Sequence, residues 1–255
     1  MKTRFFSLLL SLSLFITGCS TEFYQLYKTT CNDALTEKNG NLVYEDENFK
    51  VNYNFWGENG LMSFRFYNKT GKDIYLDLGN SFFIVNGTAN NYFQNRTFTE
   101  SGGQISYVVN NYFNIAASAS NTYSVAKQED RIVCIPSLTS KIINEFNITE
   151  TVYRHCDLLL YPKSVKPNTL KFSGKDSPFV FSNRLTYKVE NSDIPVKINN
   201  EFYVSEISNF DESHFLTEGL TTFCNEKKAV YPKLYKDPSP EKFYIKYKQT
   251  DYEKH

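Results

Sequence analysis

The sequence predicts an all-β protein built around an antiparallel β-sandwich. Hydrophobic residues alternate with polar residues in several short runs, the period of two that is typical of a strand with one buried face. Turn-forming residues separate these runs at short intervals, as they do in antiparallel sandwiches. The chain also contains 22 phenylalanines and 19 tyrosines, which favour pleated surfaces and fill a large core.

Four strands are expected in the first part of this pattern, over residues 49–55, 62–67, 74–78 and 81–85. Gly57–Gly60 and Asn86–Gly87 are among the predicted turns. The run Phe64–Leu76, FRFYNKTGKDIYL, resembles the strand-turn-strand unit of immunoglobulin-like extracellular modules. That resemblance implies an immunoglobulin-like sandwich for a first domain, which we place at residues 41–165.

Residues 86–128 interrupt the alternation and are predicted to form a long insertion with one strand, at 104–109. The tetrapeptide Asn-Asn-Tyr-Phe occurs twice in it, which makes four aromatic residues candidates for a binding site: Tyr92, Phe93, Tyr112 and Phe113. Loops on a rigid sandwich commonly carry recognition, and adjacent rings in an extended chain point to opposite sides. Two roles remain open for these rings, because they either contact a partner or pin the loop to the core.

Further strands are expected over residues 131–135, 156–161, 178–182, 184–189 and 201–207, whereas 140–146 and 149–153 fit either strands or a short helix. A boundary within residues 163–175 separates the first domain from a second, smaller β-rich module at 166–255. A short helix is predicted over 209–219, with Asn209 as its N-cap. The lysine-rich run 242–248 is predicted to be an edge strand.

The first 20 residues, MKTRFFSLLLSLSLFITGCS, predict export and membrane anchoring. Lys2 and Arg4 precede an apolar run that is far shorter than the roughly 20 residues of a membrane-spanning helix, as in a signal peptide. Ile16–Cys19 resembles the lipobox of bacterial lipoproteins. The resemblance implies that residues 1–18 are removed and that Cys19 carries the lipid and acyl (palmitate) groups. Residues 19–40 are then expected to be a lipid anchor and tether.

This resemblance places the chain in the bacterial cell envelope, held to a membrane by its lipid. Ser20 is not acidic, which in such lipoproteins favours the outer membrane, on either its periplasmic or its surface side. The precursor has 28 basic and 28 acidic residues, so it lacks the basic surface that a nucleic-acid partner requires. Besides the membrane, the expected partner is an envelope protein or a glycan.

Four further cysteines, Cys31, Cys134, Cys156 and Cys224, accompany Cys19. An even number on an oxidising export route is consistent with disulfides. A bond between Cys134 and Cys156 is the preferred pairing, since both are expected in strands of the first domain, and free thiols are the alternative. No CxxC pair occurs, and the neighbours His155 and Cys156 would face opposite ways in a strand. No metal or cofactor is therefore expected.

No motif for catalysis is visible: G-x-S-x-G, H-E-x-x-H and the phosphate-binding P-loop are all absent. The expected function is a non-enzymatic binding or structural module. The alternative is a glycan-directed envelope hydrolase that uses dispersed carboxylates. Acidic clusters at Glu45–Glu47 and Asp211–Glu212 are candidates for that role, although both are typical of solvated turns.

Overall fold

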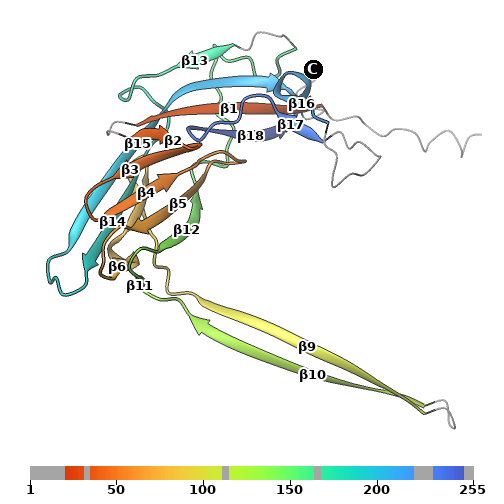
Figure 1. Ribbon diagram of the computed structural model, residues 1–255. Helices are drawn as coiled ribbons and strands as arrows, with labels where there is room; N and C mark the ends of the chain where they lie inside the picture. The colour runs from red at the N-terminus through yellow and green to blue at the C-terminus, as the bar shows by residue number, and fades with distance from the viewer. Residues whose placement is uncertain (1–20, 32–34, 111–114, 164–167, 221–231, 250–255) are drawn as a thin grey trace, which may run out of the picture.

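The computed structural model describes residues 21–31, 35–110, 115–163, 168–220 and 232–249. The protein is all-β, and its antiparallel sheets curl into a half-barrel (Figure 1), which confirms the predicted class at this level. Within the described ranges, no helix combines the length and apolarity needed to cross a membrane.

The larger sheet contains nine strands. Its main path runs β11 (Ile132–Ile135), β6 (Ile74–Asp77), β14 (Val180–Val189), β15 (Val196–Asp211), β1 (Glu22–Cys31) and β18 (Lys242–Lys248). Three more strands are attached to it, β7 (Phe82–Val85), β8 (Thr88–Asn91) and β13 (Thr169–Lys171). The lysine-rich strand β18 lies at the end of the path, as predicted for an edge.

The smaller sheet contains five strands in the order β12 (Ser140–Asn147), β5 (Leu61–Asn68), β4 (Phe49–Tyr53), β3 (Asn41–Glu45) and β2 (Thr36–Lys38). Asn39 and Gly40 connect β2 to β3 with φ angles of 52° and 67°, as a tight hairpin turn requires. Gly60, before β5, also has a positive φ of 65°, and an added Cβ there would lie 2.7 Å from the ring of Phe243.

The hydrophobic core lies between the two sheets. Alternation along β4 sends Phe49, Val51 and Tyr53 into it, and all three are fully buried. Much of the packing is between rings: Phe49 stacks on Phe66 with centroids 4.8 Å apart. This is the arrangement expected when aromatic residues occupy every second position of facing strands.

A second, smaller cluster packs Phe215 against Tyr24 and Tyr244 on the outside of the larger sheet. It involves α2 (Glu212–Phe215), β16 (Leu216–Glu218) and β17 (Lys233–Tyr235). The remaining elements are η1 (Leu78–Asn80) and the long hairpin β9 (Thr97–Asn110) and β10 (Ile115–Gln128), which extends away from the sheets (Figure 1).

Two expected segments need correction at the ends of the first domain. Residues 22–31 are not a tether, because β1 pairs with both β15 and β18 inside the larger sheet. The expected boundary between 41–165 and 166–255 also falls within this sheet, since β14 pairs with β6 and β7. Strands from both sides of residue 165 therefore share one sheet and one core.

Three further segments differ from expectation. The 86–128 insertion is mostly the regular hairpin β9–β10 rather than an irregular loop. The helix predicted over 209–219 shrinks to one turn, because β15 continues through Asn209 and Asp211 takes the N-cap position. Residues 156–161 form no strand. Of the two alternatives left open for 140–146, the structure shows the strand, β12.

Candidate functional site: a polar groove on the smaller sheet

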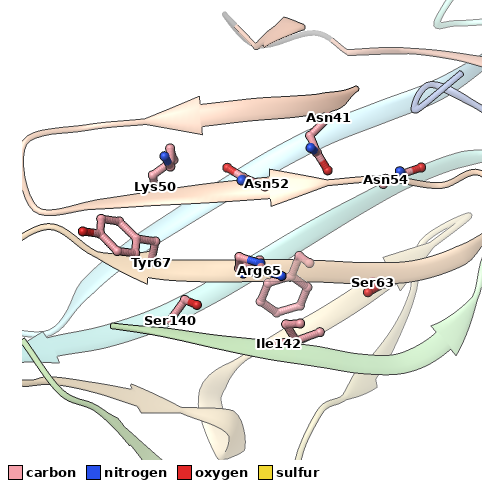
Figure 2. Close-up of a pocket in the computed structure, with 10 residues that line it drawn as sticks. Asn41, Lys50, Asn52, Asn54, Ser63, Arg65, Tyr67, Ser140 and Ile142 are labelled. Carbon is pink, nitrogen blue, oxygen red and sulfur yellow. The ribbon is translucent and has the colours of Figure 1, made fainter. Parts of the chain in front are cut away.

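A groove of about 510 Å³ runs over the outward face of the smaller sheet (Figure 2). Its lining is mainly polar and comes from β3, β4, β5 and β12 or the residues next to them: Asn41, Lys50, Asn52, Asn54, Ser63, Phe64, Arg65, Tyr67, Ser140 and Ile142. We refer to this site as the groove.

The alternation that builds the core also builds the groove. On β4, the residues between the buried positions turn outward, which places Lys50 and Asn52 on the opposite face from Phe49 and Val51. The antiparallel register then sets Tyr67 beside Lys50 and Arg65 beside Asn52. Strand β12 adds Ser140 opposite Tyr67 and Ile142 opposite Arg65. Side chains far apart in sequence thus form rows across three strands.

The groove is positively charged. The ammonium group of Lys50 lies 5.3 Å from the ring centre of Tyr67, within the range of a cation–π contact. Among the described residues, neither Lys50 nor Arg65 forms an ion pair with a carboxylate. Glu45 lies opposite Lys50, but its carboxylate pairs with Lys69 at 2.8 Å, and the hydrogen bond from Lys69 lowers its pKa.

Amide side chains follow the same face. The Oδ1 atom of Asn52 is buried and has no hydrogen-bond partner among the described residues. An unpaired buried acceptor costs free energy that a bound donor would recover. Nδ2 of Asn41 donates to the Asn39 carbonyl oxygen at 3.0 Å. Nδ2 of Asn54 donates to the Gly40 carbonyl oxygen at 3.4 Å, and Oδ1 of Asn54 accepts the Trp56 N–H at 3.0 Å.

The residues lining the groove include no histidine, cysteine, aspartate or glutamate. Ser63 and Ser140 therefore lack an adjacent base there, and a two-carboxylate hydrolysis has no acid or base at this place. The lining offers two cations, three amides, two serine hydroxyls and one tyrosine. This set is equipped for hydrogen bonds and charge interactions with a ligand.

Tyr92, predicted to be a binding residue, is fully buried in the core. Its hydroxyl donates to Oδ1 of Asn183 at 3.0 Å, and Nδ2 of Asn183 donates to the hydroxyl of Tyr53 at 3.0 Å. Tyr53 in turn donates to Oδ1 of Asn200 at 2.7 Å. Burial raises the pKa of Tyr92 well above its usual range. Of the two roles left open for Tyr92, contact with a partner or anchoring in the core, its burial and hydrogen bond fit the second.

The other three candidates do not join Tyr92 in a site. Phe93 is half-buried and packs against the main core. Tyr112 and Phe113 lie outside the described residues. The repeated tetrapeptide therefore brings no described pair of rings together on the surface. Directly after β8, the side chain of Asn91 accepts the N–H of Phe93 at 2.7 Å and so closes the turn.

Cys134 and Cys156 are not joined in a disulfide, which corrects the expected pairing. Cys134 lies on the edge strand β11, where its thiol is 3.6 Å from Oδ2 of Asp73. Cys156 lies in the irregular segment after β12, so the two do not occupy neighbouring strands. Cys19 and Cys224 lie outside the described residues.

The described acidic and histidine-containing clusters have structural roles. Asp46 accepts the N–H groups of Asn48 and Phe49 at 2.8 and 2.9 Å and so closes the β3–β4 turn. Asp211 caps α2 and holds Nδ1 of His214 at 2.7 Å. No group of three or more His, Cys, Asp or Glu within the described ranges is placed to hold a metal ion.

Comparison with known proteins adds no relative: no family model, no curated protein and no solved structure matches this chain. The groove residues were not among the residues predicted from the sequence to form a site. The polar half of the alternating runs, with Lys50, Asn52 and Arg65 at every second position, was the available signal.

Proposed function

We propose that this chain is a lipid-anchored binding protein of the bacterial cell envelope and that its groove holds a glycan. Cys19 carries the lipid, on the strength of the lipobox-like Ile16–Cys19. The body is an immunoglobulin-like module, supported by two antiparallel sheets that enclose one core. The observation that carries the binding role is the polar, cationic lining of the groove.

Glycan binding is the role that fits this lining best. Sugar hydroxyls both donate and accept hydrogen bonds, as do the amides of Asn41, Asn52 and Asn54. Lys50 and Arg65 favour a glycan that carries carboxylates, because charge-assisted hydrogen bonds are the stronger kind. A protein partner would instead require an apolar centre, for which the groove offers mainly Ile142.

The hydrolase alternative is less well supported. Glycoside hydrolysis requires two carboxyl groups roughly 5–10 Å apart across the scissile bond. The groove lining contains none, and the nearest acidic neighbour of Lys50 along the sheet, Glu45, is engaged by Lys69.

Titration of the full-length chain, in detergent, with acidic and neutral polysaccharides tests this proposal. We expect binding of acidic polysaccharide that weakens as salt is added, because exposed charges are screened. The double variant Lys50→Gln with Arg65→Gln should lose about tenfold or more in affinity. Each charge-assisted hydrogen bond is worth about 1.5–3 kcal/mol, and 1.4 kcal/mol is tenfold.

The matched control is Arg184→Gln with Lys188→Gln, which removes two exposed positive charges from β14 in the other sheet. We expect its affinity to equal that of the wild type. Equal losses in the control and the double variant would mean that only net charge matters and that the groove is not the site. Full binding by the double variant would contradict the proposal directly.

A further inference from the structure

The hairpin β9–β10, which we call the arm, stands apart from the two sheets that enclose the core. The two strands pair with each other over 14 positions, from Thr97 with Gln128 to Asn110 with Ile115. They form a sheet of their own and pair with no other described strand. Figure 1 shows the arm extending far from both sheets. At about 3.4 Å per residue, strands of this length reach more than 40 Å.

The outer edges of the arm present rows of backbone N–H and C=O groups to solvent, a template for pairing with another strand. Proteins usually guard such edges with charges, proline or short length. Between Ser101 and Ala126 the chain has no charged residue and no proline. Two other sheet edges are guarded in this way: β18 carries three lysines, and β2 is only three residues long.

The arm is held in a set direction at its base. The guanidinium group of Arg96 pairs with Glu129 at 2.6 Å and with Glu145 on β12 at 2.7 Å. The second carboxylate oxygen of Glu129 accepts the N–H groups of Gln94 and Arg96 at 2.9 and 3.0 Å. A charge-assisted network in which one guanidinium bridges two carboxylates fixes an orientation. A fixed arm loses less entropy when a partner strand is added.

We propose that the arm is a self-association surface, on which β9 or β10 of one copy pairs antiparallel with the same strand of a second copy. Two hairpins then become one four-stranded sheet, and isolated two-stranded hairpins are only marginally stable in water. The site is independent of the groove and of any glycan.

The second copy is favoured as the occupant by the composition of the arm. Across a two-fold axis, an edge strand meets its own sequence, so any charged residue near the axis would face its own copy. The arm has none between residues 101 and 126. If the partner were a different protein, charged residues on the arm could face opposite charges on that partner and so select it, as in interfaces between unlike chains.

Sedimentation velocity of the full-length chain, in a density-matched detergent over a dilution series, tests this proposal. We expect the protein mass to double with concentration in the wild type. Ser106→Lys with Ser120→Lys places a charge on each strand of the arm and should abolish the dimer. The control, Thr88→Lys with Ile194→Lys, adds the same charge at exposed positions elsewhere and should keep it.

Hydrogen exchange of the wild type gives a readout that does not depend on a variant folding. Amides in residues 97–110 or 115–128 should become protected as the dimer forms. A monomer at every concentration with unprotected arm amides would overturn the proposal. A dimer that persists in the Ser106 and Ser120 variant would also overturn it, as would arm protection that appears only when envelope extract is added, which would assign the arm to another protein.

Discussion

Tyr92 lies at one end of a buried hydrogen-bonded chain, and removing its hydroxyl tests whether it is a core anchor. The chain runs from Tyr92 through Asn183 and Tyr53 to Asn200, with every member at most 1% exposed. It links β14 and β15 of the larger sheet to β4 of the smaller sheet. In Tyr92→Phe, the Oδ1 atom of Asn183 loses the donor that satisfies it while the ring remains.

Leaving one buried polar atom unsatisfied costs about 1–3 kcal/mol. For a chain of this size, each 1 kcal/mol lowers the melting temperature by about 2–4 °C, so a central value of about 2 kcal/mol lowers it by about 4–8 °C. Tyr92→Ala also removes the ring packed against Phe64 and Phe146 and should cost about 3–5 kcal/mol.

Thermal unfolding followed by near-ultraviolet circular dichroism measures this loss. The control is Tyr67→Phe, which removes the hydroxyl of a groove tyrosine and should change stability by less than about 0.5 kcal/mol. If Tyr92→Phe melts with the wild type and loses partner binding instead, the reasoning is refuted, and Tyr92 returns as a binding residue.

Three further predictions follow from the structure. Cys134 and Cys156 should both react with a thiol reagent on the unreduced protein, with Cys134 slower because burial and the nearby Asp73 raise its pKa; protection of both in the denatured, unreduced chain would restore the disulfide. Despite burial, hydrogen bonds from Arg96 lower the pKa of Glu129 below its ordinary value of 4.5. The ionised Glu129 carboxylate therefore stabilises the fold fully above pH 4.5, and this contribution to the free energy of unfolding is lost as the pH falls below that value. The wild type should then lose more stability in acid than Glu129→Gln, and parallel losses in the two proteins would contradict this. Cys19→Ala should abolish incorporation of labelled palmitate, and equal labelling would exclude lipidation at Cys19.

The predicted strands β4 and β5 share one property, an uninterrupted alternation of large apolar and polar residues. In β4 and β5 every second residue is a core side chain, so period and burial agree. The turn predicted at Asn86–Gly87 is also present. The two residues have the positive φ angles of a tight hairpin turn, 48° and 81°.

β1 was missed because its buried positions include polar residues. Gln25 is fully buried, and its amide donates to Oδ1 of Asn209 at 2.8 Å and to the Tyr153 carbonyl oxygen at 2.9 Å. Thr29 is buried as well and donates to the Glu241 carbonyl oxygen at 2.8 Å. These polar side chains can be buried because they form hydrogen bonds with residues 128 to 212 positions away in the sequence. The local sequence around β1 does not show which distant residues those partners are.

The position of β1 also bears on the proposed anchor. Glu22, the first residue of the strand, comes three positions after Cys19, so the chain between them spans at most about 10 Å. At the start of β1, Lys246 pairs with Glu22 at 2.6 Å, and Lys248 lies opposite it in the register. A lipid on Cys19 would hold this end of the larger sheet close to the headgroups, with its lysines beside them. Copies anchored in this way would be confined to one plane, where they meet more often than they do in solution. Tight anchoring and self-association are therefore mutually consistent, although each stands on separate residues.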